Sequence, residues 1–435
     1  MGLTPTSYVE TPHVAFVRFF IGDELITLDA SGKPNNFVSF SLSRGLKHVL
    51  SFTLTVIDPE WSRIERILAR AAGQQNGQIC TFQFGYENAG GVTSRLYTGI
   101  VRKASPSFYV DGIQFVIEGS GDIGSSTLRK SSKSYPNPVT NGGVDNYKII
   151  SEYVEDIAKR KQWVYSADTI HKTKELKSFH SSDTTEPVNL RFIQNRTDEY
   201  TFIRSQLAPR AIRDKDGVAG YVFYIDNVDG SNVCHFHPPD YEKPSARTFI
   251  YMREKNSEVL SFSVEVAGEA YLAQLGGLSD VAVPLVDAFT GYYKTLMMND
   301  KNTPEKTNLA GFKQAKRPFV STPGIQAYSA VMNVPCENEA IAEALARNYY
   351  YNGYYVQLNA TLVIVGDDNP NIDPGQVVRV LITDINQAPH HTSGNYMITD
   401  KSDEIQGGIW TTTLSLTRDG FSGAGTPWVG KKNTK

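Results

Sequence analysis

A glycine pattern is the first candidate site for chemistry in the 435-residue chain. Gly119–Gly124 fits the pattern GxGxxG and follows a predicted strand. Loops with this pattern after a strand can bind a pyrophosphate through their backbone N–H groups. Such a loop must open a helix whose N-terminus faces the phosphates. The next residues, SSTLRKSSKSYP, have no apolar helical period. We therefore predict no nucleotide or other cofactor site here.

The acidic segment Asp367–Asp373 is the second candidate. Its Asp and Asn side chains alternate as calcium ligands do, but the glycine that an EF-hand needs at its sixth position is missing, and Val378 replaces the bidentate Glu. The Asn-Pro and Asp-Pro-Gly sequences predict a tight turn instead. A glycosidase-type acid pair, for example Asp367 with Asp368, stays open because such pairs are defined by their separation in space.

Histidine, cysteine and tyrosine clusters give weaker signals. Cys234 points to the opposite side of a predicted strand from His235 and His237, and no second ligand pair lies nearby, so a metal site is not favoured. His390–His391 lacks the HExxH context of a zinc enzyme. Tyr349–Tyr355 could stack on a sugar or a base, but core packing at a helix end is favoured. With no GxSxG, P-loop or catalytic cysteine signature, we predict no catalytic, cofactor-binding or metal-binding residues.

The overall composition excludes several classes of protein. Lys and Arg number 43 against 46 Asp and Glu, so no basic field attracts nucleic acid or an anionic membrane, and any contact with DNA should be passive. The longest apolar stretches, 281–286 and 361–365, are too short to span a membrane. No secretory signal is apparent, which implies folding in a cytosol. The three widely spaced cysteines predict buried thiols and neither a disulfide scaffold nor a zinc motif.

The first part of the chain predicts a β-barrel or sandwich. Short stretches with apolar residues at alternate positions are separated by turn residues. The predicted strands are His13–Phe20, Glu24–Leu28, Phe37–Leu42, Leu50–Ile57, Ile79–Tyr86, Arg95–Ala104 and Gly112–Glu118. One helix interrupts them, because Asp58 and Pro59 suit its start. Its apolar stripe consists of Ile64, Ile67, Leu68 and Ala71, and Gly73 ends it.

The middle of the chain predicts two helices and a hairpin. The first helix covers Asp145–Lys161, and the second covers Arg196–Leu207 with Thr197 as its N-cap. Tyr221–Asp226 and Asn232–His237 alternate apolar and polar residues across a glycine turn, as a β-hairpin does.

The last part of the chain predicts a second β domain. Thr248–Met252 and Val259–Val266 are predicted strands that join it. Helical spacing marks Leu285–Met298 and Asn338–Asn352. The remaining predicted strands are Tyr354–Val365, Val377–Ile382, Gly394–Lys401 and Ile409–Arg418.

The whole pattern predicts a β-rich α+β, multidomain fold, with two tube-like antiparallel β-barrel domains and an intervening α+β region. Helix plus strands recur at both ends of the chain, although no short-period repeat is present. The predicted divisions are 1–124, the first tube-like β-barrel domain; 125–144, a linker; 145–245, the α+β middle domain; 246–267, strands joining the second barrel; 268–328, an insertion of uncertain structure; 329–419, the second barrel domain; and 420–435, a flexible C-terminal tail.

Seven segments follow one another in the order and spacing of a known family pattern. Its first motif is a Leu-rich helix that carries a glutamine, an acidic pair and an aromatic residue and is followed by a hairpin. Its second motif is an Ala-rich helix followed by a long strand and by Gly-Asp and Gly-Gln. Its third motif is a closing hairpin. The matching segments are Ser51–Pro59, Phe192–Leu207, Gly220–Tyr224, Glu337–Arg347, Val356–Val380, Gly394–Thr399 and Trp410–Leu416. Together they resemble the late-control D family of phage tail proteins, the baseplate hubs of contractile tails, which are related to the hub domains of type VI secretion spike proteins. Gly268–Gly324 departs from that pattern.

The resemblance implies a virion structural protein and not an enzyme. Such a hub is a homotrimer in the tail baseplate, assembled in the host cytoplasm, that joins a sixfold tail tube protein to a threefold central spike protein. A separate spike protein is implied, and baseplate wedge or tape-measure proteins are further implied partners. DNA would meet the ring only in passing through its lumen during viral genome ejection, so the wall should not be strongly basic.

Two other classes of protein stay open from the sequence. One is a tail-associated cell-wall hydrolase, which needs convergent polar groups with shifted pKa values in a pocket. The other is a peripheral glycan-binding β protein. A rigid ring with an open lumen would favour the hub.

Overall fold

The computed structural model confirms a β-rich α+β chain with few helices. The residues that it describes are 14–27, 36–58, 63–72, 79–86, 93–110, 112–121, 130–135, 149–175, 192–214, 220–228, 230–240, 243–251, 258–266, 278–286, 293–299, 328–331, 345, 348, 358–382, 390 and 392–418. The predicted tail and most of the predicted helix Asn338–Asn352 lie outside these residues.

The first β region contains the predicted strands and helix. Its elements are β1 (Ala15–Ile21), β2 (Glu24–Leu25), β3 (Phe37–Gly45), β4 (His48–Asp58), α1 (Arg63–Ala72), β5 (Ile79–Tyr86), β6 (Tyr97–Tyr109) and β7 (Gly112–Gly121). Alternation places Phe52 and Leu54 in one buried core. The Asp58 carboxylate accepts a hydrogen bond from Ile64 N–H at 2.8 Å. Ile64 and Ile67, two residues of the predicted apolar stripe, are buried.

The middle region corrects two predictions. Its elements are β8 (Ser131–Tyr135), α3 (Ile150–Arg160), β9 (Phe192–Thr197), α4 (Glu199–Phe202), a π-helical turn η1 (Ile203–Leu207), a 3-10 turn η2 (Ala208–Arg210), β10 (Val222–Val228) and β11 (Ser231–His237). The predicted linker 125–144 contains β8, which pairs with β9. Thr197 ends β9, and Asp198 caps the helix instead, with its carboxylate accepting from Thr201 N–H at 2.8 Å. The predicted hairpin β10–β11 is confirmed.

The second β region contains β12 (Arg247–Tyr251), β13 (Val259–Val266), β17 (Leu358–Val365), a 3-10 turn η3 (Pro370–Ile372), β18 (Val377–Ile382), β19 (Gly394–Gln406) and β20 (Ile409–Arg418). β12 pairs with β18 and β13 pairs with β17. The prediction of a helix over Leu285–Met298 is wrong. Two strands, β14 (Leu278–Val286) and β15 (Tyr293–Asn299), pair there, and β16 (Tyr328–Val331) completes their separate sheet.

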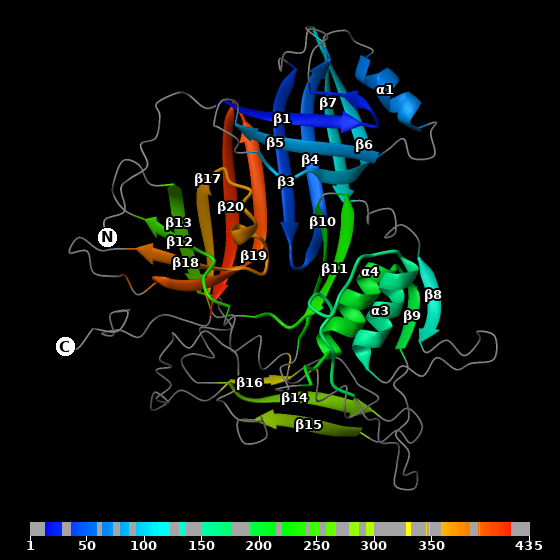
Figure 1. Ribbon diagram of the computed structural model, residues 1–435. Helices are drawn as coiled ribbons and strands as arrows, with labels where there is room; N and C mark the ends of the chain where they lie inside the picture. The colour runs from blue at the N-terminus through cyan, green and yellow to red at the C-terminus, as the bar shows by residue number, and fades with distance from the viewer. Residues whose placement is uncertain are drawn as a thin grey trace.

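The strands of the two predicted β domains belong to one continuous sheet. Its main path is β13-β17-β20-β19-β3-β4-β7-β6-β5-β1-β2 within a 15-stranded sheet. The strand β19 makes this continuity, because it pairs with β20 on one side and with β3 on the other. In Figure 1 the second β region and the first therefore lie side by side, with the middle region below them.

Each β region keeps its own apolar core, and Trp410 connects them. Trp410 lies in β20, yet it packs in the first core, with its ring 5.1 Å from the ring of Phe84 and 5.4 Å from that of Tyr86. Gly366 leaves room for this indole, since a Cβ atom there would lie 2.1 Å from it. A larger residue at 366 would push the two regions apart.

Two expectations from composition can be compared with the described residues. Cys80 and Cys234 are buried free thiols, as predicted, while Cys336 lies outside those residues. No helix among them has the length and hydropathy to cross a bilayer.

Candidate functional site

A buried cluster of charged side chains joins the two β regions. Its centre is Asp368, directly after β17. The Asp368 carboxylate accepts from Arg44 Nη2 at 2.6 Å and Lys401 Nζ at 3.1 Å. It also accepts from Tyr97 OH at 2.8 Å and from the Arg95 backbone N–H at 2.9 Å. One carboxylate of the second β region therefore binds β3 and β6 of the first.

A second carboxylate, Asp373, shares the same two arginines. Arg95 Nη1 and Nη2 donate to its two oxygens at 2.6 and 2.8 Å, and Arg44 Nη2 lies 2.8 Å from it. Fork-shaped contacts of this kind fix the orientation of both groups. Asp373 follows η3, whose N-cap Asn369 accepts from Asn371 N–H at 2.9 Å. The predicted tight turn thus positions one partner of the cluster.

The charges of the cluster stabilise one another. Burial alone would raise the pKa of Asp368, but Arg44, Lys401 and Arg95 hold it well below its usual range. Asp403 lies deeper, and burial raises its pKa against the opposing effect of Lys401. Ionised Asp368 is thus the carboxylate that neutralises the buried cations.

Burial assigns this cluster a positioning role. The side chains of Asp368 and Lys401 are 1% and 0% exposed, so no substrate reaches them. A buried ion pair is costly to break, because the partner left behind is a charge without compensation. The cluster therefore fixes the first β region against the second.

A small cavity beside the cluster holds groups with shifted pKa values. Its volume is about 120 Å³, and Asp226, Tyr224 and His235 line it with Arg44. Burial is the first cause of two of these shifts: it raises the pKa of Asp226 and lowers that of His235 to about 4. The Tyr224 ring stacks on the His235 ring with 4.5 Å between centroids. Ligand cavities usually exceed roughly 300 Å³, so packing of β10 against β11 accounts for this site.

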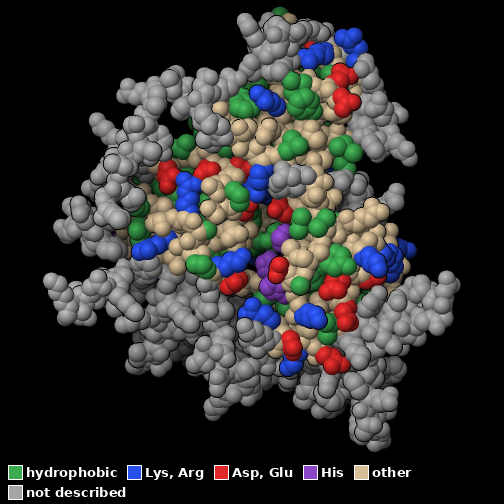
Figure 2. All heavy atoms as spheres, in the orientation of Figure 1, with side chains coloured by type: hydrophobic (Ala, Val, Ile, Leu, Met, Phe, Trp, Pro, Cys, Tyr) green, Lys and Arg blue, Asp and Glu red, His purple; other side chains and the backbone are tan. Residues whose placement is uncertain are grey.

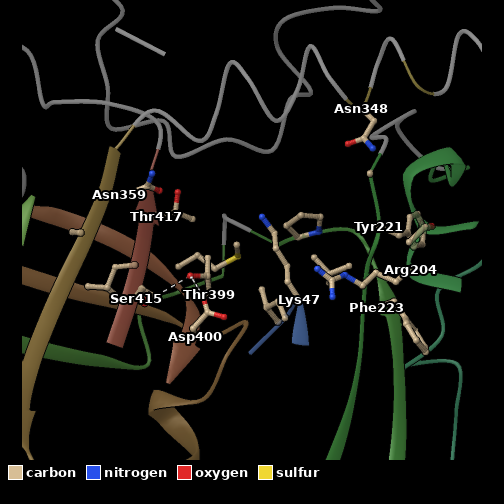
Figure 3. Close-up of a pocket in the computed structure, with 18 of the residues that line it drawn as sticks. Lys47, Arg204, Tyr221, Phe223, Asn348, Asn359, Thr399, Asp400, Ser415 and Thr417 are labelled. Atoms are coloured by element: carbon tan, nitrogen blue, oxygen red, sulfur yellow. Dashed lines mark hydrogen bonds between the residues drawn. The ribbon is translucent and has the colours of Figure 1, made fainter. Parts of the chain in front are cut away.

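A larger cavity lies where all three regions meet. Its volume is about 630 Å³. Figure 3 shows Lys47 and Arg204 in its middle, with Asn359 and Ser415 on one side and Tyr221 on the other. These groups can bind an anion or a polar chain. In the lining the Thr399 hydroxyl donates to the Asp400 carboxylate at 2.8 Å. Burial would raise the pKa of Asp400, but hydrogen bonds from His48 and Thr399 lower it, so this carboxylate is a poor general base.

The histidines that the sequence singled out lie on one strand face. His235 and His237 have their ring centroids 6.2 Å apart, and Cys234 is buried on the opposite face, as the alternation predicted. Figure 2 shows the histidine side chains gathered near the centre of the visible face. Among the described residues no group of His, Cys, Asp or Glu is arranged to hold a metal ion.

The other sequence candidates separate in the structure. Gly119 and Gly121 lie inside β7, and the rest of the glycine pattern is outside the described residues. Asp367 pairs with Arg247 and does not join the acidic cluster around Asp368. His390 Nδ1 lies 2.8 Å from the Thr392 hydroxyl, within a turn. The tyrosine segment 349–355 is outside the described residues.

The charge cluster was missed by sequence reasoning, although part of its signal was present. Arg44 stands two residues after Leu42, in phase with the buried side chains of β3. Lys401 and Asp403 stand in phase with buried Ile405 on β19. Charged residues at inward positions of a strand must find partners in the core, so the alternation pointed to a buried network.

Comparison with solved structures identifies the fold. The tail protein from Neisseria meningitidis MC58 superimposes with a TM-score of 0.54 at 12% identity, covering 94% of this chain and 98% of that chain. The 43 kDa tail protein of prophage MuSo2 from Shewanella oneidensis gives 0.53 at 12% identity, covering 93% and 98%. The chain therefore has the fold of solved tail proteins, as the resemblance in its sequence predicted. No protein-family model and no curated protein sequence matches it.

The cluster predicts a large loss of stability in Asp368→Asn. This substitution keeps the shape but removes the carboxylate that pairs with Lys401 and leaves Arg44 with Asp373 alone, so the free energy of unfolding should fall by about 3–5 kcal/mol. Urea denaturation followed by tryptophan fluorescence measures the change. Glu118→Gln is the control, because its pair with Lys103 is exposed and worth less than about 1 kcal/mol. Equal losses in the two variants would contradict the positioning role.

The buried histidines predict a loss of stability in mild acid. The pKa values of His235 and His237 are lowered by burial from 6.5 to about 4. As pH falls below about 6.5, the unfolded chain binds protons that the folded chain refuses, so stability present at neutral pH is lost between pH 6.5 and 4. The loss is at most about 3 kcal/mol for each histidine. Urea denaturation at several pH values measures it, and a His235→Gln/His237→Gln variant should flatten this pH dependence. An unchanged slope would contradict the assignment.

Proposed function

We propose that this protein is the baseplate hub of a contractile phage tail or of a related injection machine. The observation that carries the proposal is the likeness of fold, over nearly the whole chain, to two tail proteins. The buried junction supports it, because a load-bearing subunit needs its parts held as one body. The subunit would be located in the virion baseplate and assembled in the host cytoplasm.

The proposed hub is a homotrimer with an open channel. Each chain brings two β regions in one sheet, so three chains present six similar units to a sixfold tail tube and keep threefold symmetry for a central spike. Tail tube and spike proteins are therefore the principal proposed partners, with baseplate wedge or tape-measure proteins beside them. DNA passes through the lumen and makes no lasting contact.

The described cavities favour this structural role over hydrolysis of the cell wall. A hydrolase needs an accessible acid with a tuned pKa. Here the cavity that holds Asp226 and His235 measures about 120 Å³, and burial is the first cause of their pKa shifts. Asp400 lines the larger cavity, but its pKa is lowered, which is the wrong direction for a general acid. Nothing in the described surface specifically favours glycan binding.

The proposed ring can be tested by assembly. The chain is co-expressed with the tail tube and spike proteins encoded beside it, and the complex is imaged by electron cryo-microscopy. We expect three copies around a channel, with both β regions close to the threefold axis because each acts as a tube unit. A complex with another copy number, or with one β region far from the axis, would contradict the proposal.

The proposed lack of hydrolytic activity can be tested by zymography. Purified protein should leave a peptidoglycan gel uncleared, while a known lysozyme clears it. Clearing that persists in every single Asp or Glu to Ala variant would indicate contamination. Clearing that disappears in one variant would establish an enzyme and overturn the structural assignment.

A further inference from the structure

One face of the long sheet carries hydroxyl side chains across both β regions. The register aligns a single row over six strands, from β17 to β7: Val363, Thr413, Ser402, Ser43, Ser51 and Ser120. Directly opposed residues in a sheet point to the same side, so these side chains share one face. Ser261 of β13 extends the row by pairing with Val363.

The next row has the same character. It runs Thr411, Glu404, Ser41, Thr53 and Glu118 over β20, β19, β3, β4 and β7. We call these two rows, with Ser261, the hydroxyl face. The apolar core lies on the other side, where Leu42, Leu54 and Leu414 are buried. Ser51, Ser261 and Glu404 are exposed in the single chain, so this face is accessible at β13, β19 and β4, while Ser120 at its β7 end is buried.

The charge on the hydroxyl face has one sign. Its charged members are Glu404 and Glu118, and it contains no lysine or arginine, although the chain has 43 of these residues. A surface that only faces water normally mixes both signs. The first base beyond the face is Lys103 on β6, opposite Glu118 and 3.3 Å from its carboxylate.

We propose that the hydroxyl face is the inner wall of the channel, along which duplex DNA slides. This inference rests on the proposed hub function and names the residues that meet the DNA. Every lysine or arginine that touches a phosphate adds affinity by releasing counterions, and would therefore hold the DNA back. Hydroxyl groups are uncharged and keep a layer of water, and the two glutamates repel phosphate. The wall is thus suited to passage of a polyanion and not to its binding.

Cysteine accessibility in the assembled ring tests the wall. Ser51→Cys and Ser261→Cys are made with Cys336 replaced by Ser, since Cys80 and Cys234 are buried. Each ring is treated with a small fluorescent maleimide or with a maleimide on a polymer too large for the channel. We expect labelling by the small reagent only. Ser134→Cys on β8 is the exposed control and should react with both.

The other outcomes separate this inference from the proposed function. A ring in which Ser51→Cys reacts with both reagents would place the face outside, and a ring in which it reacts with neither would make the face a subunit interface. Either result overturns the wall and leaves the hub intact. If no ring forms with the partners, the hub function and the wall fail together.

Added lysines test the reason for the missing cations. The ring with Ser51→Lys and Ser261→Lys should bind short duplex DNA at least about tenfold more tightly than a ring with Ser134→Lys and Ala167→Lys, because the wall lysines converge on one duplex. Fluorescence polarisation of labelled DNA at low and raised salt measures both affinities. Equal affinities would contradict the wall, since the two variants carry the same added charge.

Discussion

The ionised carboxylate of Asp368 fixes the position of the second β region against the first. It lies with Lys401 in an interior from which water is excluded, and it also binds Arg44 and Arg95. Removing any of these charges from its partner would leave a buried ion whose cost is several kcal/mol. The strands that carry them therefore cannot shift by even one residue, because a shift of one would turn each side chain to the opposite face.

The backbone reinforces what the charges require. The strand β19 is 13 residues long. One of its edges forms backbone hydrogen bonds with β20, and the other forms them with β3. Trp410 then crosses from β20 into the core of the first β region, in space that Gly366 leaves free. Pairing, packing and charge thus act at the same seam. If β19 and β3 did not pair, each would expose a free strand edge there, which proteins usually avoid.

The strands of both β regions could be predicted from the sequence because the alternation of apolar and polar residues is a local pattern. It failed where pairing partners are distant. Ser131–Tyr135 has no apolar alternation and becomes a strand through β9, and Leu285–Met298 has helical spacing but lies across two strands that pair with each other. The charge cluster shows the same limit. The inward position of Arg44 is visible in the sequence, but its partner Asp368 is 324 residues away.

The junction and the hydroxyl face are two consequences of one alternation. On β19, Lys401 and Asp403 point inward while Ser402 and Glu404 point outward, and on β3 Arg44 points inward beside outward Ser43. Ordinary sheets place charge outside and apolar groups inside. Here β3 and β19 turn their only bases, Arg44 and Lys401, into the core, where Asp368 neutralises them. Arg44 and Lys401 therefore stabilise the junction inside the subunit and are absent from the outer face. The same alternation of residues thus gives a rigid wall and a wall without cations that could contact phosphate.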